Sequence, residues 1–359
     1  MKYIIVTQTY PPRIGGMQNV MIAISKKLAS LEDTHVFPDH FLSKKYSGTN
    51  SQLHIHNNFS PKLFRPFIKK NLVDKVYKDN DVIICDSWKS INAVPSKAKK
   101  IFVLAHGQEF LSTNKKFDLI KKSLSRASCI ICSSNYTKKL INEFKVTDTK
   151  KIVIPPTYSV EVPFDKNVKF KEKLKSVSLL TICRLEERKG IIPVLKSLSE
   201  LNKNKLLKPI LWNICGEGAQ TNEIKSYIKS LDLTEQVKLI GKISGDTKLD
   251  LIKNCDLFVM PSYKVENSIE GFGISYIEAA AYGVPSIAGI EGGVGDAVTD
   301  EETGWCVNPL NLDELSDTLK EAINNEKKRR EYGLQARKHF LDYFSGEKVF
   351  RKFMDTISI

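Results

Sequence analysis

The sequence predicts an α/β protein made of two Rossmann-like domains, each a doubly wound parallel sheet. Short β-branched apolar runs alternate with helical patterns, and this alternation occurs twice with a seam between the two series. The length of 359 residues suits two such domains, and 42% apolar residues are enough to bury two cores. We therefore expect domains over residues 1–160 and 161–340, followed by a C-terminal helix within 341–359.

The first series contains short apolar runs that we interpret as strands, over residues 3–6, 81–85, 100–104, 129–132 and 151–154. A helix is expected over 17–29, because Met21, Ile22, Ile24 and Leu28 lie near one face. Gly15 and Gly16 stand between the first strand and this helix. The polar segment 157–175 has little periodicity and is the expected linker.

The second series predicts strands over 177–183, 209–215, 237–240, 257–260 and 286–288. Helices are expected near 191–201, 219–231, 248–254 and 274–282. Short loops between strands and helices favour right-handed crossovers and a parallel sheet. Ligands of such sheets bind beyond the carboxyl ends of the strands, so we expect a shared site in a cleft between two facing domains.

The composition indicates an anionic partner without identifying it. The net charge is +14 and the pI is about 9.2. No apolar run reaches the roughly 18 residues that a membrane span needs. The apolar start of the chain breaks at Pro11 and Pro12, which is too short for a signal peptide. We expect a cytoplasmic protein.

The seven cysteines fall inside apolar, strand-like segments. Cys129 and Cys132 have the C-x-x-C spacing of metal and redox sites, but Ile130 and Ile131 between them indicate a buried strand. No second pair and no histidine at ligand spacing accompany them. We expect buried thiols and no metal site.

Two glutamates flank a glycine-rich turn in residues 270–278, EGFGISYIE. Gly271 and Gly273 allow backbone amides to approach a ligand, and a helix that starts there favours phosphate. Glu270 can then accept hydrogen bonds from sugar hydroxyls, and Glu278 from a ribose. Alternatively, Glu270 is a residue of the helix cap and Glu278 is solvated.

Arg184 and Lys189 follow the expected strand 177–183, where ligands of parallel sheets bind. Cations at this position can stabilise a diphosphate leaving group. Arginine would hold its oxygens through a planar fork and lysine would act as a point charge. The alternative is a solvated loop, because Glu186, Glu187 and Arg188 make the segment highly charged.

These segments together resemble family 4 of the retaining glycosyltransferases, which have the GT-B fold. Residues 10–17 (YPPRIGGM) are similar to the family's N-terminal loop, His106-Gly107 to its histidine after a strand, and 133–138 (SSNYTK) to a segment after the next strand. Arg184 with Lys189, residues 260–262 and 270–278, and 282–289 (YGVPSIAG) complete the resemblance. The bacterial phosphatidylinositol mannosyltransferases and lipopolysaccharide or capsule transferases resemble the chain most.

The resemblance implies an N-terminal acceptor-side domain, a C-terminal nucleotide-sugar domain and a last helix that packs back on the first. Gly16 would present its amide to the donor phosphate or sugar, and Arg184 and Lys189 would bind the diphosphate. Glu270 and the amides of Gly271, Phe272 and Gly273 would hold the sugar. Glu278 would bind the ribose, Ile243 would contact the base through its backbone, and His106 would lie near the donor sugar.

His106 could instead be satisfied by backbone groups at the strand end. Two departures from the family pattern concern other residues. Residues 292–296 read GGVGD, without the usual proline and glutamate, which puts recognition detail there in doubt. Gly346 stands where a tryptophan is usual, so the last helix is expected to be anchored more loosely.

The resemblance implies front-face substitution with retention, in which the leaving diphosphate stays on the acceptor's side and is stabilised by Arg184, Lys189 and the helix dipole. No cofactor is expected, and no divalent metal is required, because cations and amides can carry the charge. The donor would be a nucleotide-diphosphate sugar with a uridine or guanosine base, carrying a hexose or an N-acetylhexosamine.

The expected acceptor is a lipid-linked or polysaccharide glycan of the cell envelope, such as lipopolysaccharide, O-antigen or capsule. Basic pairs are concentrated in the first half, at Lys44-Lys45, Lys69-Lys70, Lys99-Lys100, Lys115-Lys116, Lys121-Lys122 and Lys138-Lys139. Apolar side chains interleave with them around Leu63, Phe64, Phe67 and Ile68, as in a membrane-surface helix. We expect peripheral binding to the anionic inner face of the cytoplasmic membrane, with a soluble basic face as the alternative.

Other function classes fit less well. A sugar-nucleotide epimerase of the same fold is the main alternative, and it would isomerise its donor without an acceptor. A phosphorylase would need a pyridoxal-phosphate lysine. Nucleic-acid binding is suggested only by the pI, and the lysines are not interleaved with stacking aromatics as in known modules.

Overall fold

The computed structural model describes residues 1–8, 10–11, 15–39, 51–58, 60–61, 63–111, 116–146, 148–162 and 176–358. The chain divides into two compact units. The first contains Met1–Ser159 together with Gly346–Ile359, and the second contains Val160–Ser345. The sequence placed the two boundaries after residues 160 and 340, whereas the structure places them after residues 159 and 345.

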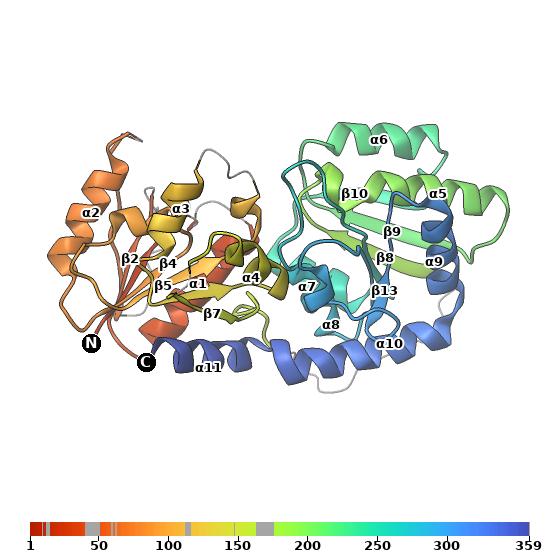
Figure 1. Cartoon of the computed structure of the whole chain (residues 1–359). Helices are drawn as coiled ribbons and strands as arrows, with labels where there is room; N and C mark the ends of the chain where they lie inside the picture. Colours follow the sequence, from red (N-terminus) through yellow and green to blue (C-terminus); the bar gives the residue numbers. More distant parts are fainter. Residues whose placement is uncertain are drawn as a thin grey trace. The chain divides into compact units, whose positions relative to one another are not determined.

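Within the described ranges, the first unit forms a seven-stranded parallel sheet in the order β3-β2-β1-β4-β5-β6-β7 (Figure 1). Its strands are β1 (Tyr3–Val6), β2 (Thr34–Phe37), β3 (Leu53–Ile55), β4 (Val82–Cys85), β5 (Ile101–Ala105), β6 (Cys129–Cys132) and β7 (Lys150–Val153). The central strands β1, β4, β5 and β6 are buried along their whole length. Burial on both faces explains their continuous apolar sequences.

The helices of the first unit are α1 (Gly16–Ala29), α2 (Arg65–Val76), α3 (Phe117–Leu124), α4 (Asn135–Asn142) and the C-terminal α11 (Gly346–Ile357). Helix α11 belongs to this unit although it comes last in the chain. Phe353 on α11 is fully buried, and its ring meets the ring of Tyr158 edge-on at 5.5 Å. The glycine at 346 therefore does not prevent α11 from burying its apolar face.

The second unit forms a six-stranded parallel sheet, in the order β10-β9-β8-β11-β12-β13. Its strands are β8 (Val177–Ile182), β9 (Ile210–Cys215), β10 (Val237–Gly241), β11 (Leu257–Met260), β12 (Ser286–Ala288) and β13 (Gly304–Cys306). Its helices are α5 (Ile191–Lys203), α6 (Thr221–Ser230), α7 (Gly245–Lys253), α8 (Ile274–Ala280), α9 (Leu312–Asn324) and α10 (Glu326–His339).

Two apolar clusters cover the two faces of this second sheet. Leu179 packs in the cluster that contains side chains of α5, α6 and α9, whereas the adjacent Leu180 packs in the cluster that contains side chains of α7 and α8. Successive strand residues point to opposite faces, so neighbouring leucines enter different cores. This arrangement confirms the predicted pair of doubly wound parallel sheets.

The strands β2, β3 and β13 were not predicted. They are only three or four residues long, and β3 has the pattern of a partly exposed edge strand, with His54 between two half-buried residues. The helices α2, α3, α4, α9 and α10 were not assigned bounds either. Their sequences are highly charged, so their short apolar stripes appear only once the sheet is in place.

Some residues that the sequence analysis singled out lie outside the described ranges. Lys44, Lys45, Lys115, Arg13 and residues 163–175 of the expected linker fall outside them. In the part of the chain that the structure describes, no helix has both the length and the apolar character needed to cross a bilayer.

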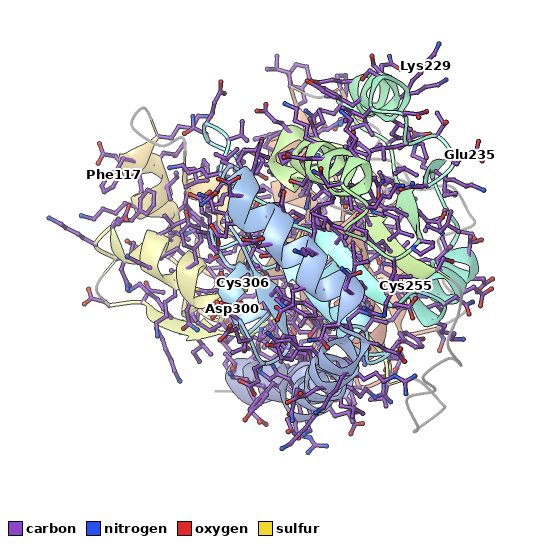
Figure 2. All side chains as sticks on the ribbon, turned by 90° about the vertical axis from the view of Figure 1, so that its right-hand side faces the viewer. Phe117, Lys229, Glu235, Cys255, Asp300 and Cys306 are labelled. Carbon is purple, nitrogen blue, oxygen red and sulfur yellow. The ribbon has the colours of Figure 1, made fainter. Side chains whose placement is uncertain are left out.

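All seven cysteines are free thiols. Cys129 and Cys132 lie buried in β6, as predicted, and burial raises the pKa of Cys129 to about 11. Cys183 and Cys306 are only half-buried, so the expectation of full burial was wrong for these two. Cys255 and Cys306, labelled in Figure 2, lie well apart. A thiol with a raised pKa is a poor nucleophile at neutral pH, so Cys129 is a packing residue.

Three histidines form a ladder at the β2–β3 edge of the first sheet. The ring of His35 stacks on those of His54 and His56, with centroids 4.7 and 5.1 Å apart. His35 Nδ1 and His56 Nε2 share a hydrogen bond of 2.8 Å, which requires at least one neutral ring. Burial, followed by the neighbouring His56 and His54, lowers the pKa of His35 to about 4.

We expect this ladder to make the first unit acid-sensitive. An unfolded histidine has a pKa of about 6.5, so the contribution of neutral His35 is complete above that pH and is lost as the pH falls towards about 4. Urea unfolding at pH 7.5 and pH 5 should show a larger loss of stability in the wild type than in His35→Gln. The more exposed His54→Gln should keep most of the wild-type pH dependence. Equal pH dependence in the wild type and His35→Gln would contradict the prediction.

Candidate functional site

The sheet of the second unit brings two loops together at its switch point. Strands β8 and β11 are neighbours, but the chain leaves them in opposite directions along the sheet, and ligands of such folds bind at this point. The loop after β8 contains the 3-10 helix η4 (Glu187–Lys189), and the loop after β11 begins at Pro261. The amide of Tyr263 donates to the carbonyl oxygen of Arg188 at 2.9 Å, which ties the two loops together.

Gly190 allows this close approach. Its φ is +72°, and a Cβ built on it would lie 2.1 Å from the carbonyl oxygen of Pro261. A side chain here would both strain the backbone and collide with the neighbouring loop. The glycine after Lys189 is therefore required for the two loops to meet.

Glu270 lies at the centre of a buried ion cluster. Its Oε2 accepts a hydrogen bond from Arg188 Nη1 at 2.9 Å and a second from Lys189 Nζ. The side chains of Arg188 and Lys189 are each 8% exposed, and that of Glu270 is 15% exposed. The alternative interpretation, a solvated loop, is therefore wrong for Arg188 and Lys189.

The cluster keeps Glu270 ionised. Burial alone raises the pKa of this carboxyl, but the charges and hydrogen bonds of Lys189 and Arg188 outweigh burial and hold the pKa at about 2. Burial lowers the pKa of Arg188, and Glu270 more than compensates for it. Glu270 is therefore a hydrogen-bond acceptor at physiological pH and cannot serve as a proton donor.

Arg184 extends the cluster towards solvent. Its side chain is 73% exposed and pairs with Glu186 at 2.9 Å, and Glu186 pairs in turn with Arg188 at 3.1 Å. The linked set contains the cations Arg184, Arg188 and Lys189 and the carboxylates Glu186 and Glu270, an excess of one positive charge. The two cations predicted from the sequence thus differ, because the side chain of Lys189 is buried and that of Arg184 is exposed.

The glycine-rich turn before α8 buries Phe272 and Gly273 and leaves Gly271 half-buried. Gly273 has φ +94° and stands directly before α8. Phe272 is only 3% exposed and packs on Phe344, so its side chain belongs to the core. Among the described residues, the amides of Gly271, Phe272 and Gly273 donate no hydrogen bond. These amides can therefore donate hydrogen bonds to a ligand, and the role that the sequence predicts for them stays a prediction.

The glycine-rich segment 292–296 is also tied to this turn. The amide of Gly293 donates to the carbonyl oxygen of Glu270 at 2.8 Å. Gly292 has φ +75°, and a Cβ built on it would lie 2.3 Å from the same oxygen. The segment is therefore anchored at Glu270 despite its missing proline.

Glu278, four residues into the helix α8, is not solvated. Its Oε1 pairs with Lys248 Nζ of α7 at 2.5 Å, and the two side chains are 20% and 25% exposed. Ile243 lies between β10 and α7, where its half-buried side chain packs against the apolar cluster of α7 and α8. Glu278 therefore contacts α7, and Ile243 precedes that helix in the chain.

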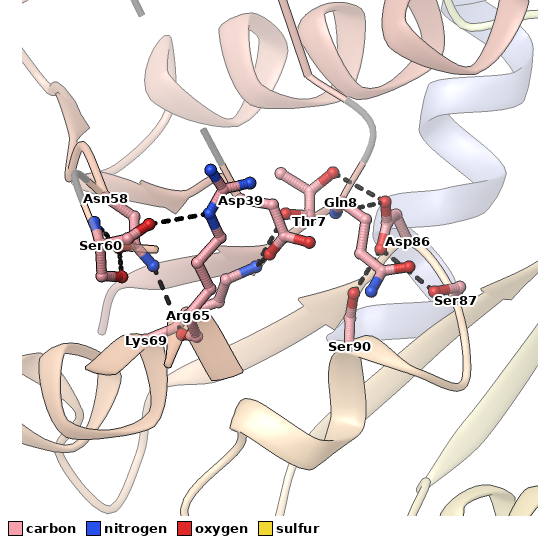
Figure 3. A network of polar contacts seen from close by, with 10 residues as sticks. All are labelled: Thr7, Gln8, Asp39, Asn58, Ser60, Arg65, Lys69, Asp86, Ser87 and Ser90. Carbon is pink, nitrogen blue, oxygen red and sulfur yellow. Dashed lines mark hydrogen bonds and ion pairs between the residues drawn. The ribbon is translucent and has the colours of Figure 1, made fainter. Parts of the chain in front are cut away.

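The first unit has its own polar network at the carboxyl ends of β1 and β4 (Figure 3). Asp86, 2% exposed, accepts hydrogen bonds from Thr7 Oγ1 at 2.8 Å, from the amide of Gln8 at 2.7 Å and from Ser90 Oγ at 2.5 Å. Lys69 of α2 donates to the carbonyl oxygen of Thr7 at 3.0 Å and pairs with Asp39. The network fixes the chain as it leaves β1 towards α1.

His106 follows β5 at the same end of this sheet. Its Nε2 lies 3.0 Å from the carbonyl oxygen of Asp86 and must donate, because a carbonyl only accepts. Its other ring nitrogen, Nδ1, is buried without a hydrogen-bond partner in the part of the chain that the structure describes. The backbone therefore satisfies one nitrogen, as the alternative interpretation held, and leaves the other unpaired.

Two further predicted segments form helix starts in the first unit. Gly16 is the exposed first residue of α1, directly after Gly15. In the segment 133–138, the hydroxyl of Ser134 accepts from the amide of Thr137 at 3.1 Å and caps α4. This cap explains the serine structurally.

Sequence analysis missed Arg188, Lys248 and Asp86. Arg188 stands beside the predicted Lys189, and was attributed to the solvated part of the loop. Asp86 comes directly after the strand β4, so its position at a strand end was a usable signal. Lys248 was not separable from the many other lysines, because only the folded helix α7 places it against Glu278.

Removing the Glu270 carboxylate should strongly destabilise the second unit. Glu270→Ala leaves Arg188 and Lys189 buried without their partner, a change that typically costs about 3–5 kcal/mol. Urea unfolding should show this loss, whereas Glu347→Ala, which breaks an exposed pair with Arg351, should cost less than about 1 kcal/mol. A similar small loss in both variants would mean that the buried cluster contributes little. Because the pKa of Glu270 is depressed, its contribution should be present above about pH 4.3 and fall as the pH drops towards 2.

Residues 164–339 match the family of glycosyl transferases group 1. The chain is 23% identical over 363 residues to a GDP-mannose-dependent monoacylated alpha-(1-6)-phosphatidylinositol monomannoside mannosyltransferase of Corynebacterium glutamicum, covering 94% of this chain and 93% of that protein. It is 26% identical to a 2-deoxystreptamine N-acetyl-D-glucosaminyltransferase of Niallia circulans over 205 residues, 56% of this chain and 50% of the relative.

Solved structures share the fold over the full length. The crystal structure of Anabaena HepE in complex with UDP and glucose has a TM-score of 0.78 at 18% identity, covering 100% of this chain and 99% of that one. The lipopolysaccharide outer core galactosyltransferase WaaB has a TM-score of 0.73 at 17% identity, covering 99% of each chain. The solved structures therefore show the GT-B fold over the whole chain, and the second half of the chain is similar to the glycosyl transferases of group 1.

Proposed function

We propose that the chain is a retaining transferase that moves a hexose or an N-acetylhexosamine from a nucleotide-diphosphate sugar to a lipid-linked or polysaccharide acceptor. The acceptor belongs to a cell-envelope glycan such as lipopolysaccharide, O-antigen or capsule. The observation that carries the proposal is the cationic cluster around Glu270 at the switch point of the second sheet, with one positive charge in excess. A diphosphate leaving group needs such charge to depart.

In this proposal the second unit binds the donor. Arg184 and Lys189 hold the diphosphate, and the amides of Gly271, Phe272 and Gly273, together with Glu270, hold the transferred sugar. Glu278 accepts hydrogen bonds from the ribose, and the backbone at Ile243 contacts the base. The ionised state of Glu270 supports its role, because a carboxylate with a pKa of about 2 accepts hydrogen bonds from hydroxyl groups at any physiological pH.

The first unit supplies the remaining groups in this proposal. The amide of Gly16 approaches the donor phosphate or sugar, and His106 lies near the donor sugar. The Nε2 hydrogen bond to the carbonyl oxygen of Asp86 supports this role for His106, because it fixes the orientation of the imidazole ring directly after β5.

The reaction is front-face substitution. The bond between the anomeric carbon and the diphosphate oxygen breaks, and the electron pair leaves with the diphosphate. The acceptor hydroxyl oxygen forms the new bond on the same face, and its proton passes to the departing phosphate. Arg184, Lys189 and the amides stabilise the growing charge without a divalent metal, and loss of one such donor commonly costs about 10²–10³-fold in rate.

The relatives support this class of substrate without selecting one. One relative by its name uses GDP-mannose and a phosphatidylinositol mannoside, and the HepE structure contains UDP and glucose. We therefore propose either a uridine or a guanosine donor.

A thermal-shift panel tests the donor site. UDP, GDP, ADP and their sugar conjugates are added without metal to the wild type, Glu278→Ala and Glu326→Ala. One nucleotide should stabilise the wild type, by about 2.7 kcal/mol at 100 times its Kd, and Glu278→Ala should reduce this response. Glu326→Ala removes an exposed pair with Arg330 and should respond as the wild type does.

Two results would contradict the donor site. Stabilisation by no nucleotide would remove the support for a nucleotide-sugar enzyme, and an equal response in Glu278→Ala would remove that residue from the site. Isomerised donor in an incubation without acceptor would instead favour the epimerase.

We also propose that the first unit binds an anionic membrane on the cytoplasmic side through α2 and the residues before it. Leu63, Phe64 and Phe67 are 84%, 56% and 68% exposed, an unusual group of large apolar side chains at one helix start. Exposed Lys70 and Lys75 on the same helix add positive charge. Lys69, which the sequence counted among the surface pairs, is buried and bound to Asp39, so that expectation is corrected.

Sedimentation with vesicles containing an anionic phospholipid at low salt tests the membrane proposal. Replacing Leu63, Phe64 and Phe67 together by Ser should weaken partitioning at least about tenfold, because a buried side chain of this kind contributes about 1.5–3 kcal/mol. A matched variant with Leu310, Leu312 and Leu334 replaced by Ser removes exposed apolar surface from the second unit and should bind normally. Equal binding of both variants would overturn the proposal.

A further inference from the structure

Arg188 and Lys189 hold the same oxygen of Glu270, but they are anchored very differently. Arg188 bonds to Glu270 through Nη1 at 2.9 Å and to Glu186 through Nε at 3.1 Å. Its backbone carbonyl also accepts from the amide of Tyr263 at 2.9 Å. The side chain of Lys189 has Glu270 as its ion-pair partner among the described residues. Arg188 is therefore fixed between two carboxylates, whereas Lys189 has one contact to exchange.

The chemistry of the two side chains fits this difference. A guanidinium is planar and rigid, and it can bind two carboxylates at once in fixed directions. An ammonium on a flexible stem is a point charge that can turn towards the strongest nearby anion. A diphosphate at the carboxyl end of β8 would compete with Glu270 for Lys189, because it carries more negative charge.

Glu270 would lose its counter-ion if Lys189 turned away and no other cation remained. A buried carboxylate without a partner tends to take up a proton, and a protonated Glu270 would be a weaker acceptor of hydrogen bonds from sugar hydroxyls. Arg188 removes this problem, since its bond to the carboxylate does not depend on Lys189.

We propose that Arg188 is a positioning residue, which keeps Glu270 ionised and oriented while Lys189 is transferred to the diphosphate of the donor. The inference rests on the proposed donor site. It gives Arg188 a role that differs from the diphosphate binding predicted for Arg184 and Lys189. In this arrangement Lys189 and Arg184 bind the diphosphate, and Arg188 remains bound to Glu186 and Glu270.

A direct test follows the ionisation of Glu270 with inorganic pyrophosphate as the probe. The ¹³Cδ resonance of Glu270, assigned with Glu270→Gln, is recorded at pH 6 in the wild type and in Arg188→Gln. Glu270 should stay ionised in the wild type with and without pyrophosphate. In Arg188→Gln it should become protonated when pyrophosphate is added. An ionised Glu270 in Arg188→Gln under both conditions would overturn the proposal, and so would a pyrophosphate-insensitive protonation, because Lys189 would then not be exchanged.

Kinetics with the nucleotide sugar that binds give the second readout. Arg188→Gln should lower kcat about 10²-fold, leave KM for the donor within about threefold, and introduce a new acid limb in the pH profile between pH 4 and 7. Arg188→Lys should recover part of the loss. A raised KM with unchanged kcat would make Arg188 a phosphate ligand instead, and overturn the proposal.

Arg329→Gln is the matched control for stability. Arg329 is also a buried arginine of the second unit, 8% exposed, but it bonds to the carbonyl oxygens of Ala322 and Ile323 away from the loops of β8 and β11. It should lose stability and keep the wild-type kcat and pH profile. If Arg188→Gln behaves in the same way, the positioning role is wrong. If the wild type transfers no sugar, the proposed function fails separately, and the pyrophosphate titration still decides the role of Arg188.

Discussion

The whole donor-side arrangement depends on one topological constraint, the neighbouring positions of β8 and β11 in the second sheet. The chain winds away from this pair in both directions, so the loops that follow the two strands leave the same edge side by side. One loop supplies Arg184, Arg188 and Lys189, and the other leads to Glu270. Gly190 leaves room for the second loop to approach, and the hydrogen bond from the amide of Tyr263 to the carbonyl oxygen of Arg188 joins the two loops.

Once the loops meet, electrostatic attraction fixes the positions of their charged side chains. A carboxylate as buried as Glu270 is unfavourable alone, and two cations as buried as Arg188 and Lys189 are unfavourable without it. Each group is therefore held by the others more firmly than any exposed pair would be. A buried cluster of this kind is weak as a source of net stability but strong as a source of fixed geometry, and fixed geometry is what a charge-stabilising site requires.

The sequence predicted the repeated sheet architecture because the strands buried on both faces must be continuously apolar, as in 129–132 and 257–260. It did not predict β3 or β13, because a three-residue edge strand carries no periodic signal. At the site, Lys189 and Glu270 were found from their positions after strands, but their mutual contact spans 81 residues of sequence and appears only in the fold. Arg188 was misread for the same reason, since three charged neighbours look solvated until a distant carboxylate buries one of them.

The two units treat the same edge of a Rossmann-like sheet in opposite ways. In the first unit, the carboxylate of Asp86 accepts hydrogen bonds from neutral groups, namely the hydroxyls of Thr7, Ser87 and Ser90 and the amide of Gln8. In the second unit, the carboxylate of Glu270 is satisfied by two cations and the linked set retains a positive charge. Hydrogen bonds from neutral groups hold a carboxylate in place without adding positive charge, whereas a cationic set attracts phosphate. The difference in donors, rather than the shared fold, is what favours the second unit as the half that binds the charged part of the donor.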